Sequence, residues 1–402
     1  MEKVEQRPKF DAAKFGQELK AARDASKPTQ AEEDKHLSGI EFCVTVLGAV
    51  GVLLAIRGVI SPLAMIAIGY YKYAKFAILA HHSLHGGWGL SRRGSFAQGL
   101  YRRCIDWLDW IFPQAWIVEH NKHHHYHLNE DADPDFVERN LDFLRRQEWP
   151  MAGKLAFVGA NAMTWKWFYY ASNTLKLLHA DKKGAPEKLD GTMVTITTAL
   201  GFAVKGDRWY QVLAADLFVR VLGPPALLHM FFLPVASGLL LRLLGVTSVG
   251  TLGGLPFCWA ALANSMGAEI VTNSHAFCTI VTNHAGSDLW AFDDTCLTDT
   301  PEFYLRAVLG SSAYHAGSDL IDFFHGYLNY QGEHHAFPNL SPLHYQRLHP
   351  LFKSVCAKHG VPYVQEPMWT RTQKTVDVMV GRASMPRIQG QACDQPSLWM
   401  KM

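Results

Sequence analysis

The 402-residue sequence lacks the features by which several common protein classes are recognised. Its formal net charge is only +2, so it has no basic excess for binding nucleic acid and we expect no nucleic-acid partner. Its seven cysteines include no Cys-x-x-Cys pair, which argues against a zinc ribbon and a thioredoxin motif. The odd number of cysteines and the charged start of the chain, without an apolar secretory leader, predict reduced thiols that face a cytosol.

Long apolar stretches, by contrast, are present and predict an all-α integral membrane protein. Each is close to the ~17–25 residues that a bilayer core requires. Only Arg57 and Gly58 join the first two, as in a hairpin turn outside the membrane, which disfavours the alternative of buried helices in a large soluble domain. In the second stretch, Lys72 and Lys75 can extend toward the membrane surface. The four predicted spans cover residues 40–56, 59–80, 221–241 and about 251–274.

These spans divide the chain into an N-terminal segment (1–39), a membrane domain (40–365) and a C-terminal tail (366–402). Basic residues predict the orientation, because cytosolic segments carry an excess of Lys and Arg. The N-terminal segment is basic in this sense, and the two hairpin connections offer only Arg57 and Arg242. We therefore expect both termini and the large segment 81–220 to be cytosolic. The basic residues of that segment include Arg92, Arg93, Arg102, Arg103, Arg145 and Arg146.

Histidine is unusually abundant, with 20 residues against 19 prolines, and the predicted topology places its clusters on one face of the membrane. Residues i, i+3 and i+4 share one face of a helix. The stretches HHSLH (81–85), HNKHHHYH (120–127) and QGEHH (331–335) all contain this spacing. The candidate metal ligands are His81, His85, His120, His123, His124, His125, His334 and His335.

Neutral imidazole suits iron, copper, nickel or zinc. One metal cannot use so many ligands, so we expect two metals. Nearby carboxylates are suited to orient the imidazole N–H groups. The acidic candidates for this role are Glu119, Glu130, Asp131, Asp133, Asp135 and Glu333.

The three clusters resemble the histidine boxes of membrane fatty acid desaturases, which read H-x-x-x-H, H-x-x-H-H and Q-x-x-H-H. The wider LNYQGEHHAFPNL (328–340) is especially similar to the third box. TNHAGSD (282–288) matches the place where the family supplies a further histidine, so the resemblance implies His284 as a ligand. Gln331 stands where other members of the superfamily have histidine, and is expected to be a weak ligand or to support one. The resemblance covers roughly residues 40–365.

This resemblance implies four membrane helices with a cytosolic helical cap that holds two iron ions. It also implies O₂-dependent desaturation of a fatty acyl chain, carried by a lipid, coenzyme A or acyl carrier protein. The chain has neither the His-Pro-Gly-Gly motif of a fused cytochrome nor a GxGxxG loop, so we expect a separate ferredoxin or cytochrome as electron donor. The aromatic stretch TWKWFYY (164–170) could line an acyl channel, although an interfacial aromatic belt is favoured.

The second box admits two registers. Read as H-x-x-H-H, it uses His120, His123 and His124, which α-helical geometry favours. Read as H-x-x-x-H-H, it uses His120, His124 and His125, and resembles bacterial membrane alkane hydroxylases, which the spacing to Asp133-Pro134 favours. A hydroxylase or other oxygenase of an alkyl or acyl chain is therefore the main alternative. A metal transporter is less favoured, because transporters hold ligands near the bilayer midplane.

Overall fold

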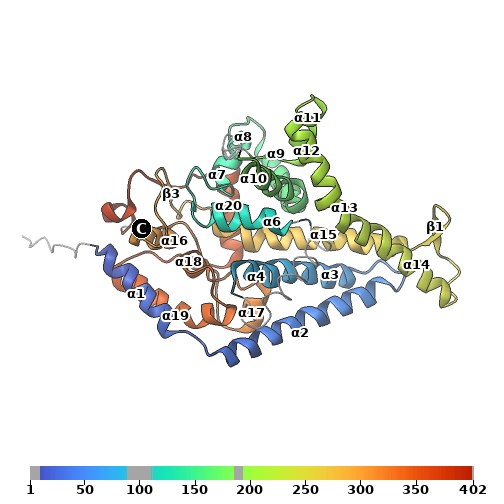
Figure 1. Cartoon of the computed structure of the whole chain (residues 1–402), viewed down its shortest axis with the longest axis horizontal. Helices are drawn as coiled ribbons and strands as arrows, with labels where there is room; N and C mark the ends of the chain where they lie inside the picture. The colour runs from blue at the N-terminus through green and yellow to red at the C-terminus, as the bar shows by residue number, and fades with distance from the viewer. Residues whose placement is uncertain (1–9, 88–109, 111, 185–192, 401–402) are drawn as a thin grey trace, which may run out of the picture.

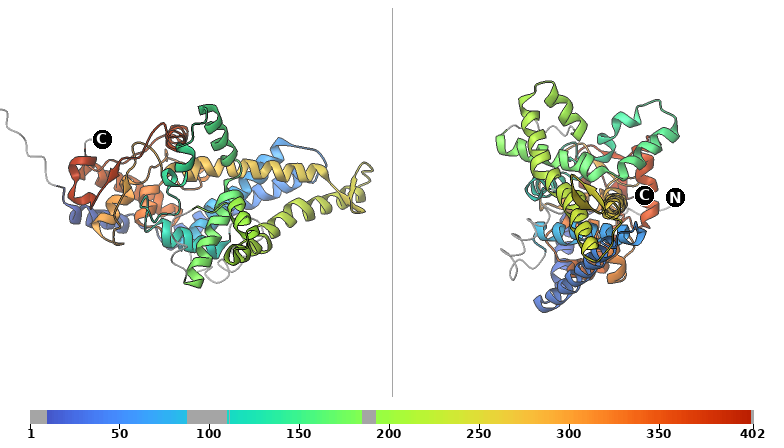
Figure 2. Two further views of the ribbon diagram at one scale, coloured as in Figure 1. Left: turned by 90° about the horizontal axis from the view of Figure 1, so that it is seen from above. Right: turned by 90° about the vertical axis from the view of Figure 1, so that its right-hand side faces the viewer.

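The computed structural model describes residues 10–87, 110, 112–184 and 193–400 (Figure 1). Arg92, Arg93, Arg102 and Arg103, which contributed to the predicted orientation, lie outside the described residues. Helices dominate the described chain. In Figure 1, α2, α3, α14 and α15 extend toward one side of the molecule, and α1, α16, α18 and α19 gather at the other. Figure 2 shows the same elongated shape from above and from one end.

The elements up to residue 183 form the N-terminal hairpin and the segment that carries the second histidine cluster. Their bounds are α1 (Ala12–Ala25), α2 (Gln30–Ala55), α3 (Pro62–Ala74), η1 (Lys75–Ala80), α4 (His81–His85), α6 (Pro113–Trp116), η2 (Ile117–His124), α7 (Val137–Asn140), α8 (Asp142–Arg145), α9 (Met151–Ala162), η3 (Lys166–Tyr170) and α10 (Ala171–Lys183).

The remaining elements return through the bundle and complete the C-terminal region. Their bounds are α11 (Ile196–Val204), α12 (Arg208–Asp216), η5 (Leu217–Leu222), α13 (Gly223–Ala226), η6 (Leu227–Phe232), α14 (Leu233–Leu243), β1 (Gly250–Leu252), β2 (Leu255–Phe257), α15 (Trp259–Ile280), η7 (Val281–Asn283), β3 (Ala291–Phe292), α16 (Pro301–Leu309), α17 (Asp319–Phe324), α18 (Gln331–Ala336), α19 (Pro342–His359), α20 (Met368–Met379), β4 (Arg387–Ile388), η8 (Ala392–Asp394) and α21 (Pro396–Trp399).

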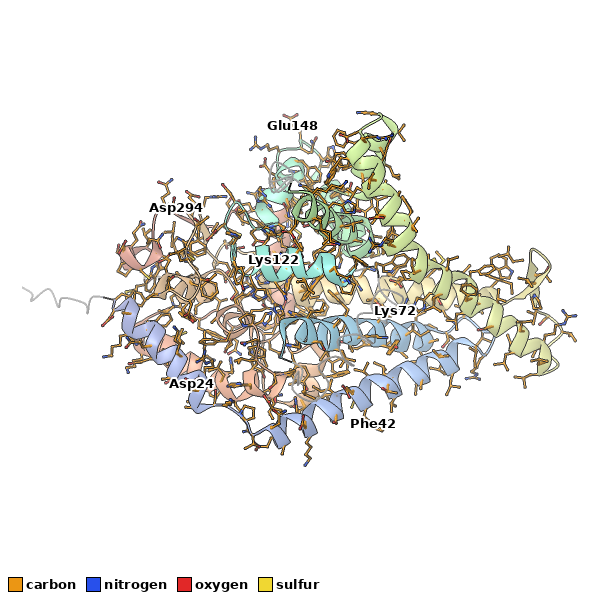
Figure 3. The ribbon with its side chains drawn as sticks, in the orientation of Figure 1. Asp24, Phe42, Lys72, Lys122, Glu148 and Asp294 are labelled. Atoms are coloured by element: carbon orange, nitrogen blue, oxygen red, sulfur yellow. The ribbon has the colours of Figure 1, made fainter. Side chains whose placement is uncertain are left out.

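Three helical stretches of the described chain are long and apolar enough to cross a membrane: Gln30–Ala55, Pro62–His85 and Arg208–Leu243. They overlap the first three predicted spans. Arg208–Leu243 contains the whole predicted span 221–241, whereas Gln30–Ala55 ends one residue short of the predicted 40–56 and Pro62–His85 begins three residues after the start of the predicted 59–80. The first helix begins ten residues before residue 40, because Thr29 and Glu32 form a capping box at its start. Phe42, on α2, is 70% exposed and points away from the bundle, as a lipid-facing side chain would (Figure 3).

The predicted start of the fourth span is wrong. Residues 250–257 form the antiparallel hairpin β1–β2, and the helix begins only at Trp259. Gly253 and Gly254 both have positive φ angles, of 56° and 84°, and the two-residue Gly-Gly turn is a strong hairpin signal. The helix that follows, α15, is rich in buried polar residues, including Asn264, Glu269 and Asn273.

Close packing and a buried ion pair join α15 to α3. A side chain at Gly69 would place a Cβ 2.8 Å from Val271, so the absence of a side chain permits the close approach of the two helices. Lys72 (labelled in Figure 3), which was expected to extend toward the membrane surface, is instead 3% exposed. It pairs with Glu269. That expectation is wrong because α15 supplies a counter-charge, which makes burial of the ammonium group less costly than it would be in lipid.

The first and last helices of the described chain belong to one core. Phe15 and Leu19 of α1 belong to one hydrophobic core with Phe352 and Trp399. The last part of the chain is also held by a parallel pairing of β3 with β4. Segments that the sequence left unassigned therefore form part of the core beside the third histidine cluster.

Candidate metal centre

The histidine clusters converge from four separate places in the chain. Helix α4 continues directly from α3 and η1, so the second membrane helix delivers the first cluster. The second lies on η2, the third on α18, and His284 directly follows η7. Potential ligand atoms fall within 4.8 Å of one another in two groups: His81, His85, His120, His125 and His334 form the larger, and His124, His284 and His335 the smaller.

Facing imidazoles of the larger group are close enough to share a cation. The Nε2 atoms of His81 and His334 are 3.0 Å apart, and those of His120 and His125 are 3.2 Å apart. An imidazole nitrogen lies about 2.1 Å from a bound metal, so two ligands at a right angle are separated by about 3 Å. Within the described chain, neither ring nitrogen of His335 has a hydrogen-bond partner. These residues therefore fit metal ions better than a closed hydrogen-bonded network.

The two groups adjoin each other, because the rings of His125 and His335 stack with centroids 4.4 Å apart. Burial lowers the pKa of His120, His125, His334 and His335 well below the ordinary value. Their imidazoles are therefore neutral near pH 7 and offer lone pairs to metals. Burial also lowers the pKa of His284 in the same way.

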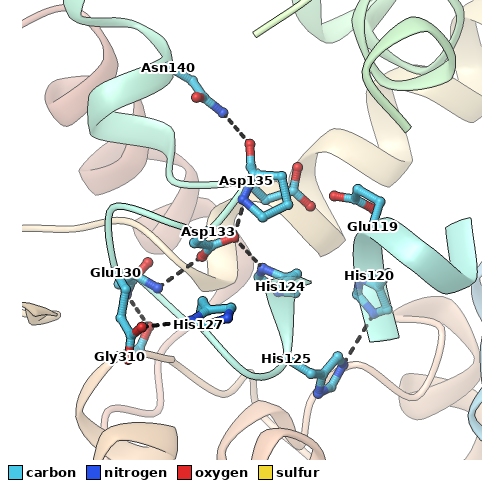
Figure 4. Close-up of polar contacts among 12 residues, drawn as sticks. Glu119, His120, His124, His125, His127, Glu130, Asp133, Asp135, Asn140 and Gly310 are labelled. Atoms are coloured by element: carbon cyan, nitrogen blue, oxygen red, sulfur yellow. Dashed lines mark hydrogen bonds and ion pairs between the residues drawn. The ribbon is translucent and has the colours of Figure 1, made fainter. Parts of the chain in front are cut away.

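The second cluster forms a π-helix, and this decides which histidines converge. The backbone N–H of His125 donates to the carbonyl of His120 at 3.0 Å, an i→i+5 bond that widens the turn. In an α-helix those residues would be about 140° apart; here their side chains meet (Figure 4). His123 lies outside both groups and its ring stacks against His127. The helical argument for His123 is therefore wrong, because it assumed α-helical geometry.

Two hydrogen bonds fix the orientation of candidate ligands. Asp133 accepts a hydrogen bond from Nδ1 of His124 at 2.9 Å (Figure 4). Tyr345 donates its hydroxyl proton to the carbonyl of Phe337, so its oxygen accepts from Nδ1 of His334 at 3.0 Å. Each bond leaves Nε2 as the nitrogen with a free lone pair. The sequence suggested Asp133 for this role, but Tyr345 on α19 carried no motif that could have identified it.

The environment of His124 differs from that of the other histidines in the two groups. Burial lowers its pKa, but the neighbouring Asp133 and Asp135 carboxylates outweigh burial and hold the pKa above its ordinary value.

Two other acidic candidates do not contact the two groups. Glu130 bonds His127 at 2.8 Å and Arg306 at 2.9 Å. Glu333 bonds His349 at 2.7 Å and the hydroxyl of Tyr363 at 2.8 Å. The expectation that Glu130 and Glu333 orient candidate ligands is therefore wrong, because the histidine that each of them bonds lies outside the two groups. The amide oxygen of Gln331 is buried with no hydrogen-bond partner among the described residues, and its role as a weak ligand stays a prediction.

An acidic pair, buried Glu119 and partly buried Asp135, borders the centre. Glu119 and Asp135 lie within 4.8 Å of a ligand atom of His120 (Figure 4). Tyr170 donates a hydrogen bond to Glu119 at 2.8 Å, and Tyr169 donates one to Asp135 at 3.1 Å. Burial raises the pKa of both carboxyl groups. The pair therefore favours holding a proton over carrying two negative charges.

An apolar cavity of about 170 Å³ adjoins both groups, and His81, His120, His124 and His284 form part of its wall. Its volume far exceeds the ~10–15 Å³ that one water requires. The other lining residues are predominantly apolar or aromatic, and include Phe76, Trp116, Trp165, Phe168, Tyr169, Tyr170 and Phe277. Four of these belong to the stretch 164–170, for which an interfacial belt was favoured. That expectation is wrong, because the stretch folds into η3 and the turn before it and directs these rings to the cavity.

A buried arginine from the C-terminal tail supports the loop that carries His284. Arg371 has no exposed surface, donates to the carbonyl of Ala285 at 3.0 Å and pairs with Asp288 at 2.7 Å. A Cβ at Gly286 would lie 2.5 Å from both partners of this ion pair, so only glycine fits without a rearrangement. The sequence gave no signal for Arg371, which lies beyond the region of resemblance.

Comparisons with known proteins agree with this geometry. A sequence model of the fatty acid desaturase family matches residues 58–367, which include every histidine of both groups. The chain is similar to fatty acid desaturase 3 of Bos taurus (50% identity over 50 residues, 12% of this chain and 11% of the relative). It is also similar to a fatty acid desaturase 2-like protein of Mus musculus (49% over 47 residues, 12% and 10%) and to fatty acid desaturase 3 of Homo sapiens (49% over 49 residues, 12% and 11%). The matched stretch spans about a tenth of the length of these relatives. No solved structure matches the chain.

Proposed function

Because the chain belongs to the fatty acid desaturase family, and is therefore an oxidoreductase, we propose that it desaturates a fatty acyl chain with O₂ at a di-iron centre. The observation that carries the proposal is the contact between two adjacent groups of buried histidines and one apolar cavity. In the reaction, two hydrogens leave the acyl chain, and with two electrons and two protons they reduce O₂ to two waters.

The larger histidine group would hold one iron and the smaller group the other, with Gln331 as a weak ligand or support. The bound irons supply the oxidising power needed to take hydrogen from an unactivated methylene. The protein must hold one part of the chain against the centre. The aromatic and apolar cavity wall is suited to this, because it offers an acyl chain apolar contacts beside the histidines. Trp116 stacks on His120 with ring centroids 4.3 Å apart, which restricts the motion of that imidazole.

The membrane arrangement is part of the same proposal. Helix α15 would be the fourth span, shielded by α3 and α14, and the histidine centre, both termini and the cap around them would be cytosolic. The bilayer supplies the environment of the spans. A separate ferredoxin or cytochrome would deliver the electrons.

A hydroxylase or other monooxygenase of an alkyl or acyl chain is the second candidate. It is favoured by one observation, the convergence of His125 rather than His123, since the H-x-x-x-H-H register is the one that resembles alkane hydroxylases. Desaturation and hydroxylation share their first hydrogen abstraction, so the histidines alone do not separate them.

Expression in a host with a simple lipid profile tests the proposal. Fatty acids from cells that carry the wild-type chain are compared by mass spectrometry with those from cells that carry His124→Ala. A new species lighter by two hydrogens supports desaturation, whereas a species heavier by one oxygen supports hydroxylation. Elemental analysis of the purified protein is the companion measurement. Full activity in protein that contains zinc and no iron would refute the di-iron assignment.

A further inference from the structure

Helix α9 presents an uncharged surface, although it lies outside the candidate membrane spans. Its twelve residues contain a single charged side chain, Lys154, which is 7% exposed. The Lys154 ammonium group turns inward and donates to the carbonyl of Arg145 at 2.8 Å. The outer face carries Leu155 and small residues, and exposed Met163 follows directly. A helix that faces water normally carries charged or polar groups on its outer face.

Helix α11 has the same character. Its nine residues include no charged side chain, and Leu200, Phe202 and Val204 are all exposed. The turn that follows it leads directly into Arg208–Leu243, one of the candidate membrane spans. Only the short polar turn 205–207 therefore separates the apolar surface of α11 from a candidate membrane span.

Both helices adjoin the apolar cavity. Phe157 and Val158 of α9 line it, as do Met193 and Thr195 immediately before α11. Phe143, which precedes α9, lines the cavity and is also 45% exposed, so the cavity reaches the protein surface there. In Figure 1, α9 and α11 lie on the same side of the bundle, opposite α2.

Their lengths exclude membrane crossing and fit an interfacial position. At 1.5 Å per residue, α9 is about 18 Å long and α11 about 14 Å, against the ~30 Å of a bilayer core. Exposed Trp149 stands just before α9. Arg146, which pairs with Asp142 at 2.7 Å, and Glu148 are also exposed before it, so charged groups end where the apolar face begins. Tryptophan and arginine are typical of the boundary between acyl chains and headgroups.

We propose that α9 and α11 are embedded in the bilayer interface beside the cavity opening, and that the substrate chain enters laterally while still esterified in a membrane lipid. This inference rests on the proposed function, whose acyl carrier it specifies. A coenzyme A or acyl-carrier-protein group is strongly polar, and would have to lie against this uncharged face. A membrane lipid places its headgroup beside Arg146 and its chain against the apolar side chains.

Photocrosslinking tests the interfacial position without relying on activity. The full chain is reconstituted in phosphatidylcholine vesicles that contain a phosphatidylcholine with a diazirine on one acyl chain, irradiated and mapped by peptide mass spectrometry. We expect adducts within 151–163 and 196–204, in addition to adducts on the candidate spans. Adducts on the spans with none in these two segments would overturn the inference.

The form of the substrate is tested with the same vesicles and a chemical or enzymatic electron source. One sample carries the test fatty acid in phosphatidylcholine, a second receives it as acyl-CoA, and a third as acyl carrier protein. We expect oxidation of the phosphatidylcholine-bound chain. Oxidation of a soluble thioester alone refutes lipid-bound entry and leaves the proposed function intact, whereas oxidation of none of the three counts against both.

A matched pair of variants connects the two results. Leu155→Glu places a charge on the outer face of α9, and Leu297→Glu places one on an 80% exposed residue of a loop far along the chain. We expect Leu155→Glu to slow oxidation of vesicle lipid about tenfold, because a charge at the interface is costly. The same variant should retain its rate on substrate in detergent micelles. Equal rates for both variants in vesicles would contradict the proposed position of α9.

Discussion

The placement of His125 rather than His123 beside the metal-binding groups leads to a sharp prediction. Replacement of His125 by alanine removes one of five nitrogens from the larger group. Loss of a group that only orients a ligand already costs about 10–100-fold in metal affinity. We therefore expect His125→Ala to weaken binding of a metal by at least about 100-fold, or about 2.7 kcal/mol.

His123→Ala is the matched control, since the two residues are of the same type and lie two positions apart. His123 is partly exposed and outside both groups, so we expect full metal content and a stability change within about 0.5 kcal/mol. Both variants are purified in the same detergent, and the metal per chain is measured by plasma mass spectrometry after dialysis against a graded chelator. Circular dichroism verifies that each variant retains its helices.

The reasoning fails if His123→Ala loses metal while His125→Ala retains it. That outcome would mean that residues 120–124 are α-helical when metal is bound, since only then would His123 face the same side as His120. Loss of metal in both variants would also count against the π-helical register, because that register places His123 outside both groups and predicts that it contributes nothing to metal binding.

Three further predictions concern two residues near the centre, Asp133 and Arg371, and one at the start of α2, Glu32. Asp133→Asn replaces the acceptor of the His124 Nδ1 proton, and should reduce metal affinity about 10–100-fold in a chelator titration. Arg371→Leu removes the buried one of two cations that pair with Asp288, leaving Lys374, and takes away the support of the His284 loop. We expect the free energy of unfolding to fall by about 3 kcal/mol, the low end for a buried pair, because Asp288 is partly exposed and keeps Lys374. The Arg347 guanidinium and the Thr29 cap hold the pKa of Glu32 at about 2, below the ordinary value of 4.5. The ionised Glu32 carboxylate therefore stabilises the fold fully above about pH 4.5, and this contribution is lost as the pH falls toward 2. The unfolding midpoint of Glu32→Gln should therefore lie below that of the wild type at pH 6 and approach it near pH 2.

Controls for these variants come from exposed residues of the same type. Asp131→Asn changes an aspartate that is 72% exposed, and should retain metal. Arg382→Leu removes an arginine that is 46% exposed, and should shift the thermal midpoint far less than Arg371→Leu. A loss of metal in Asp131→Asn equal to that in Asp133→Asn would contradict the assigned orientation of His124. Equal shifts of the thermal midpoint in Arg371→Leu and Arg382→Leu would refute the claim that Arg371 supports the His284 loop. A difference between Glu32→Gln and the wild type that does not change with pH would refute the claim that the contribution of Glu32 depends on its ionisation.

Much of the fold followed from hydropathy and charge, because a membrane helix must satisfy its backbone internally and expose apolar side chains. Three predicted spans overlap long helices of the structure along most of their length. The fourth was placed too early, since a run of apolar residues does not separate a hairpin from a helix, and the Gly253-Gly254 turn was overlooked. The snorkelling position of Lys72 was wrong for a different reason: its partner Glu269 lies 197 residues away along the chain.

The sequence by itself determined the chemistry available to this protein: the histidine clusters, their attachment to the ends of apolar helices, and the acidic Asp133 near the second cluster. These are local properties, and local spacing expresses them. The tertiary structure decided which histidines meet, because the i→i+5 bond at His125 forms within a packed segment whose α-helical alternative has nearly the same sequence signal. It also brought Tyr345 to His334, and Arg371 to the loop that carries His284, from distant helices. Their roles come from long-range contacts, which no periodicity in the sequence records.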